Sequence, residues 1–147
     1  NIGADRHDRI TRFHAPYHRT IAELVRTKRP TLIAAIHSFT PALETGGAPR
    51  PWPVGILYNR DTRAARLAIE LLRAQGFETG DNEPYSGRQL NMTLNRHAEA
   101  SGIASFAIEV RNDGIESPQG VAKWADILAP MLTTIVARLA PPAGTGL

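Results

Sequence analysis

Three short apolar runs, each followed at once by polar residues, dominate the pattern of the chain. They lie at residues 31–36, 54–58 and 105–110, and five of the six residues in the first run are apolar. Continuous apolar runs of this length are typical of strands that are buried on both faces of a parallel sheet. The pattern therefore predicts three main strands and one short additional strand at most, at 77–79.

Apolar residues recur every three or four positions elsewhere, which predicts helices over 5–28, 62–75, 93–100 and 118–139. Pro16 either kinks the first helix or marks the first turn of a new one, and Pro130 predicts a kink or break in the last. The alternation of helices and strands indicates an α/β fold, with a mostly parallel mixed sheet flanked by helices. We expect one domain over 1–140 and a flexible tail over 141–147.

Composition narrows the possible chemistry. The 147 residues contain no cysteine, so a metal site needs His, Asp or Glu, and a reducing cytoplasm is the expected location. No apolar run approaches the roughly 18 residues of a membrane span, so we expect no membrane partner. The net charge of +3 comes from scattered arginines without a basic block. Scattered arginines favour small anionic ligands over nucleic acid.

Polar side chains stand at or just beyond the ends of the three apolar runs. His37 follows the first run, Asn59 and Arg60 follow the second, and Glu109 lies in the third, two residues before Arg111. Because the ends of parallel strands share one edge of a sheet, where ligands collect, we expect His37, Asn59, Arg60 and Glu109 to converge. An isolated strand-end histidine can equally bond a neighbouring loop.

Glu109 has apolar neighbours on both sides, which should desolvate its carboxylate, raise its pKa and suit it to general acid–base work. The alternative is a carboxylate paired with Arg60 or Arg111. Arg50, Arg60 and Arg111 could each clamp a substrate carboxylate, or be solvated surface residues.

Two further groups are candidates for a site. The loop 80–87 holds two acids, an amide and a phenol, although its residues are also turn formers. His97 lies on a short polar helix that could reach the same edge, or it is an exposed helix residue. His14 and His18 share one helix face but lack the glutamate of the zinc motif, so we expect no metal there.

Several motifs, read together and in order, resemble the N-formylglutamate amidohydrolase family over about residues 5–140. They are FHAPYH at 13–18, HSFTP at 37–41, RPW at 50–52 with VGILYNRD at 54–61, GDNEPYSG at 80–87, TLNRHAE at 93–99 and IEVRND at 108–113. HSFTP and GDNEPYS are specific in combination.

The resemblance implies a fold similar to zinc-dependent exopeptidases of the phosphorylase/hydrolase-like class, with one zinc ion, a polarised water and a glutamate base. It implies hydrolysis of a small anionic N-acyl amino acid, such as N-formylglutamate to formate and glutamate in histidine degradation. His37 would then be a zinc ligand and Glu109 the base. The expected substrate-binding residues are Asn59, Arg60, Asn82, Glu83, Tyr85, His97 and Arg111.

The chain also departs from the family pattern. Family members are usually nearly twice this long, and the His-containing segment expected to supply the other metal ligands has no counterpart here. Pro53 and Gly114 replace the residue types usual in relatives, and the chain begins with Asn1 rather than Met. We therefore expect the C-terminal part of a longer or clipped protein. The alternative function is a non-catalytic module that binds acidic metabolites or a partner; specificity and oligomeric state stay open.

Overall fold

The computed structural model describes residues 2–44 and 46–140, and the chain divides into two compact units, Asn1–Pro30 and Thr31–Leu147. The first unit is helical and the second contains the sheet, so each is described by itself. The expectation of one domain over 1–140 stays a prediction. The tail expected at 141–147 lies outside the described residues.

The first unit is a run of three helical segments: α1 (Ile2–Arg9), the π-helical η1 (Ile10–His14) and α2 (Ala15–Lys28). Pro16 lies in the first turn of α2. Because proline has no backbone N–H, the preceding turn cannot keep its full α-helical bonding, and a wider π turn occupies that place. The predicted helix over 5–28 is thus present, and Pro16 marks the first turn of a new helix.

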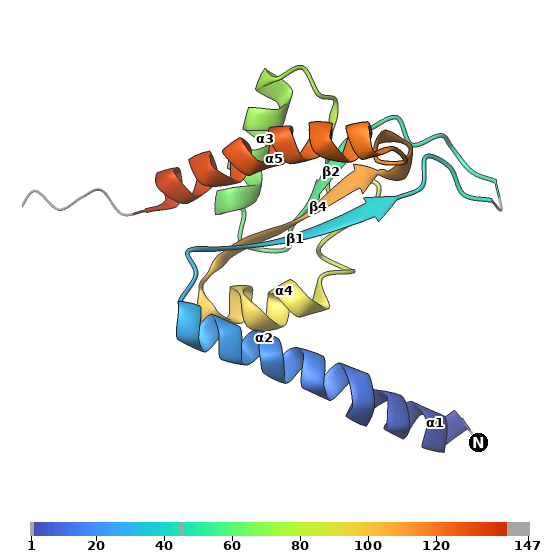
Figure 1. Ribbon diagram of the computed structural model, residues 1–147, viewed down its shortest axis with the longest axis vertical. Helices are drawn as coiled ribbons and strands as arrows, with labels where there is room; N and C mark the ends of the chain where they lie inside the picture. Colours follow the sequence, from blue (N-terminus) through green and yellow to red (C-terminus); the bar gives the residue numbers. More distant parts are fainter. Residues whose placement is uncertain (1, 45, 141–147) are drawn as a thin grey trace, which may run out of the picture. The chain divides into compact units, whose positions relative to one another are not determined.

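The second unit is built on a four-stranded mixed sheet in the order β1-β4-β2-β3. Its strands are β1 (Leu32–Phe39), β2 (Val54–Leu57), β3 (Thr79–Asp81) and β4 (Ala104–Arg111). β1 runs parallel to β4 (Figure 1). β2 runs parallel to β3 but antiparallel to β4. The predicted α/β class with a mostly parallel mixed sheet is confirmed.

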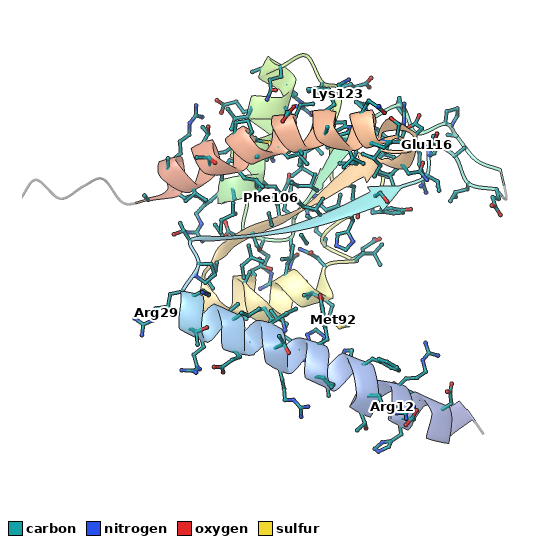
Figure 2. The ribbon with its side chains drawn as sticks, viewed as in Figure 1. Arg12, Arg29, Met92, Phe106, Glu116 and Lys123 are labelled. Carbon is teal, nitrogen blue, oxygen red and sulfur yellow. The ribbon has the colours of Figure 1, made fainter. Side chains whose placement is uncertain are left out.

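Helices cover both faces of this sheet (Figure 1). α3 (Arg63–Ala74) and α5 (Pro118–Leu139) lie on one face, and α4 (Met92–His97) lies on the other; the short 3-10 turns are η2 (Glu99–Ser101) and η3 (Asn112–Gly114). Side chains of β4 alternate between the two faces. Phe106 points into the main core beneath α5 (Figure 2), whereas Ala107 packs with Leu94 of α4.

α5 carries the apolar stripe that its sequence predicted, and it also has an N-terminal cap. The Ser117 hydroxyl accepts a hydrogen bond from the Gly120 N–H at 3.1 Å, and one stripe of the helix enters the core. Pro130 faces outward and the predicted break does not occur. α5 is long and apolar enough to span a membrane, but core helices of soluble proteins pass the same test, and four of its side chains are buried in the core.

Only part of the sheet matches the expectation of strands buried on both faces. β4 is the central strand that carries the candidate carboxylate, and seven of its eight residues are buried. β1 lies at the edge of the described sheet, and the Ile36 side chain is 59% exposed. The prediction that residues 31–36 form a fully buried strand was therefore wrong. In the described sheet β1 has a neighbouring strand on one side only, so part of it stays exposed.

Candidate active site

One row across the four strands defines the candidate site. His37 of β1 pairs with Glu109 of β4, Glu109 pairs with Gly55 of β2, and Gly55 pairs with Gly80 of β3. Residues paired in this way point to the same face of a sheet. The row therefore places an imidazole and a carboxylate side by side, followed by two positions without side chains, on the face that carries α4.

The two glycines admit a loop against the sheet. A Cβ atom added to Gly55 or to Gly80 would collide with the backbone carbonyl oxygen of Glu83. The segment from Glu83 to Tyr85 continues over this face, where Tyr85 packs against the cluster around Ala107. This close approach lays loop backbone directly over the sheet next to Glu109.

Glu109 is a buried acid whose surroundings favour its protonated form. Its side chain is buried, 8% exposed, and among the described residues its Oε2 atom has no hydrogen-bond partner. Burial raises the pKa of the Glu109 carboxyl, and the nearby His37 only partly opposes this. The expectation of a raised pKa is confirmed. A buried, unpartnered carboxylate oxygen is a natural acceptor for a water or substrate proton.

This raised pKa has a consequence for folding. The folded state holds the Glu109 proton more tightly than the unfolded chain, so the stabilisation is complete at low pH and is lost as pH rises through the folded pKa. Glu109→Gln does not titrate. The unfolding free energy of the variant minus that of the wild type should therefore increase as the pH rises above 4.5, the ordinary pKa of a glutamate, as measured by urea denaturation. A difference that is flat or decreases with pH would contradict the raised pKa.

Arg111 is occupied by the protein itself. Its Nε donates to Asp113 Oδ1 at 2.9 Å, and its Nη1 donates to the carbonyl oxygens of Arg50 and Pro51 at 3.1 and 3.0 Å. The Arg111 backbone N–H donates to the Pro53 carbonyl at 2.9 Å. Arg111 therefore fastens the long loop before β2 to the end of β4, and its expected role in binding a substrate carboxylate stays a prediction.

Arg50 belongs to that loop and lies on the face of the sheet that also holds His37 and Glu109. Its Nη1 donates to the Tyr85 hydroxyl and to the Thr40 carbonyl oxygen, both at 3.1 Å. Its guanidinium carbon lies 5.0 Å from the centre of the Tyr85 ring and 6.0 Å from that of Phe39. Tyr85, expected in the site, thus lies beside one of the three candidate arginines.

Asn59 and Arg60 do not join His37 and Glu109, and the predicted convergence was wrong in this respect. β2 is antiparallel to β4, and Leu57 pairs with Ala107. The chain therefore leaves β2 near the start of β4, at the other end of the strands from Glu109. There the Asn59 Nδ2 atom donates to Glu99 Oε2 at 2.8 Å. Sequence periodicity identifies a strand but does not give its direction, which is why this error arose.

Glu99 organises that end of the strands. Its Oε1 atom accepts from the backbone N–H groups of Arg60 and Asp61, at 2.9 and 3.0 Å, in addition to the bond from Asn59. Hydrogen bonds to a charged group contribute about 1.5–3 kcal/mol each. The three bonds here share one half-buried carboxylate that water can also reach, so their contributions do not add up in full. Glu99→Ala should therefore lower the unfolding free energy by about 2 kcal/mol, measured by denaturant titration.

Glu70 offers the matched control, since its exposed carboxylate makes one long contact, 3.4 Å, to Arg138. An exposed pair of this kind contributes little, so Glu70→Ala should change stability by less than about 1 kcal/mol. Equal losses in the two variants would mean that Glu99 does not hold the loop.

The remaining predicted residues have mixed placements. Asn82 is in the left-handed region, with φ of 56°, and its Oδ1 accepts from the backbone N–H groups of Tyr58 and Gly87, both at 3.0 Å. Asn82 therefore shapes the loop. Glu83 contributes its backbone to the site, while its side chain is exposed. Burial, and then Arg96, lowers the pKa of His97, which is buried on α4 rather than exposed.

The donor set for a metal is incomplete in the part of the chain that the structure describes. Residues 2–44 and 46–140 contain no group of three or more His, Asp or Glu side chains placed to hold a metal ion. A catalytic zinc ordinarily has three protein ligands. His37 and Glu109 supply one imidazole and one carboxylate, so the described residues do not by themselves fit a zinc centre.

Comparisons with known proteins agree with the motifs. The family model described as N-formylglutamate amidohydrolase matches residues 3–116, which confirms the resemblance found in the sequence. No curated protein matches the chain. Two solved structures share the fold: a gene product of Agrobacterium tumefaciens, at 26% identity with a TM-score of 0.82, and N-formylglutamate amidohydrolase from Ralstonia eutropha, at 22% identity with a TM-score of 0.71.

The match covers nearly all of this chain and about half of each solved structure. In both comparisons 92% of this chain is aligned, against 55% of the Agrobacterium protein and 54% of the Ralstonia protein. The chain therefore spans about half the length of the structures it matches.

Proposed function

Because this chain belongs to the N-formylglutamate amidohydrolase family, we propose that the protein hydrolyses the amide bond of an N-acylated acidic amino acid. N-formylglutamate, cleaved to formate and glutamate, is the proposed substrate. One observation carries the proposal: the buried Glu109 carboxylate, with an unpartnered oxygen, lies beside His37 and under a closely packed loop.

Glu109 supplies the proton transfers that amide hydrolysis needs. In its ionised form the free Oε2 accepts a proton from the attacking water as the new C–O bond forms at the acyl carbon. The protonated carboxyl then gives this proton to the departing nitrogen as the C–N bond breaks, which releases the carboxylic acid and the amine and returns Glu109 to its ionised form. A raised pKa suits both steps, because it makes the carboxylate a stronger base than an exposed glutamate.

We also propose a divalent metal requirement for the whole protein, with His37 as one ligand. His37 is the imidazole paired with Glu109 across the sheet, and a neutral imidazole is the commonest protein metal ligand. The other ligands are not among the described residues. The proton transfers above are assigned to Glu109 alone and do not depend on this part of the proposal.

A second function is favoured by the incomplete donor set. A non-catalytic module that binds an acidic metabolite would keep the cationic and aromatic groups around Arg50 and Tyr85 without a metal centre. Such a module would bind N-acyl amino acids at equilibrium and release them unchanged.

A substrate panel separates the two functions. The full-length protein should be assayed against N-formyl and longer N-acyl derivatives of glutamate, aspartate and glutamine, before and after exhaustive chelation. Release of formate that stops with metal removal and returns with zinc supports the hydrolase. Saturable binding without turnover, in protein of verified metal content, supports the binding module. Turnover that survives confirmed metal loss would remove the metal requirement and leave the role of Glu109.

A further inference from the structure

We propose that Arg50 is the residue that binds a carboxylate group of the substrate, and thereby selects acidic amino-acid derivatives. This inference rests on the proposed function for the identity of the ligand. It assigns the role that the sequence left open among three arginines to the one that lies beside Tyr85 and has no ion pair among the described residues.

Arg50 is a half-buried cation without an anionic partner. The groups that accept hydrogen bonds from its Nη1 are uncharged: the Thr40 carbonyl and hydroxyl oxygens, at 3.1 and 3.4 Å, and the Tyr85 hydroxyl, at 3.1 Å. No ion pair to Arg50 exists between described residues, whereas Arg63 and Arg111 each pair with a neighbouring aspartate. A partly desolvated guanidinium without a counter-ion favours the approach of an anion.

The backbone of Arg50 is fixed on both sides. Its N–H donates to the Pro41 carbonyl at 3.0 Å, and its own carbonyl accepts from Arg111 Nη1 at 3.1 Å. Arg111 is in turn held by Asp113 at 2.9 Å. Arg50 is therefore preorganised, and a ligand that binds to it has less ordering entropy to lose.

The position of Arg50 relative to Glu109 suits a substrate that spans both. Phe39, which contacts the guanidinium, lies two residues after His37 on β1 and therefore on the same face of the sheet. Tyr85, the second ring beside the guanidinium, packs with Ala107, two residues before Glu109. A molecule whose amide faces Glu109 can thus place a carboxylate against the Nε and Nη2 edge of Arg50, which makes none of the three bonds above.

Equilibrium binding tests this role without requiring turnover. The full-length protein and its Arg50→Gln, Arg50→Lys and Arg138→Gln variants should be titrated calorimetrically with three ligands. The ligands are N-formylglutamate, the analogue with an amide in place of the side-chain carboxylate, and the analogue with an amide in place of the α-carboxylate. Arg138→Gln is the control, because it removes the same charge as Arg50→Gln. Arg138 lies on α5, which covers the opposite face of the sheet.

Arg50→Gln should weaken binding of N-formylglutamate about 10- to 100-fold, as expected for loss of charged hydrogen bonds, and Arg50→Lys should recover only part of it. One of the two amide analogues should bind wild type and Arg50→Gln equally, which identifies the carboxylate that Arg50 holds. Arg138→Gln should bind like the wild type. Thermal denaturation of each variant checks folding, and Arg50→Lys carries the test if Arg50→Gln does not fold.

The outcomes separate this inference from the proposed hydrolase. Diacid binding that weakens in Arg50→Gln and Arg50→Lys supports the assignment of Arg50, even if no variant and no wild-type sample releases formate. Conversely, turnover of N-formylglutamate with the same diacid preference in Arg50→Gln as in the wild type would overturn the role of Arg50 and leave the hydrolase in place.

Discussion

Glu109→Gln is expected to lower turnover of N-formylglutamate by the full-length protein at least about a hundredfold, the typical effect of removing a general base. The amide has nearly the shape of the carboxyl group but cannot accept the water proton. Because the wild-type Oε2 atom is buried without a hydrogen-bond partner among the described residues, the substitution breaks no observed hydrogen bond of that atom. Folding should therefore persist, and kcat should fall more than KM rises.

Glu116→Gln is the matched control, because it makes the same chemical change at an exposed position outside the row of the site. Its kcat should equal that of the wild type. Circular dichroism and thermal denaturation should show that both variants are folded. Wild-type turnover in folded Glu109→Gln would remove Glu109 from the chemistry, whatever the metal content of the protein.

Gly55→Ala is expected to have the second largest effect, on both stability and activity. The added methyl group would collide with the Glu83 carbonyl, which is backbone and cannot rotate away like a flexible side chain. Overpacking of this kind costs about 1–3 kcal/mol in unfolding free energy. Displacement of the loop should also make the Glu109 carboxylate more exposed to solvent and lower its pKa, which weakens it as a base.

Gly3→Ala serves as the control for this change, since a Cβ atom at Gly3 meets nothing within 4 Å. The unfolding free energy of Gly3→Ala should equal that of the wild type or slightly exceed it. Gly3 lies in α1, and alanine is a better helix former than glycine. Urea denaturation and kcat/KM should be measured for both variants. A Gly55→Ala protein as stable and as active as the wild type would show that the loop does not depend on the bare glycine.

Much of the fold could be predicted from local patterns alone. The apolar run at 105–110 identified β4, and the stripe of apolar residues from 118 to 139 matched α5 at both ends. The apolar neighbours of Glu109 predicted its desolvation, because residues within one strand share the same buried environment. In each of these cases the signal and the structure that it predicts lie within one element.

Only the tertiary structure decided which of the candidate site residues lie next to one another. The antiparallel direction of β2 takes Asn59 and Arg60 away from Glu109, and brings Gly55 opposite Glu109 instead. The bonds of Arg111 tie it to the loop before β2 and to Asp113, while that loop brings Arg50 beside Tyr85.

The physical reason is the range of the interactions involved. Hydrophobic periodicity reports whether a segment has a buried face, a property of neighbouring residues. Strand direction, register and hydrogen bonds such as that between Arg50 and Tyr85, 35 residues apart, depend on segments that meet only when the chain folds. The sequence by itself therefore determined the main elements and the burial of Glu109, and the packing of the sheet decided which side chains surround it.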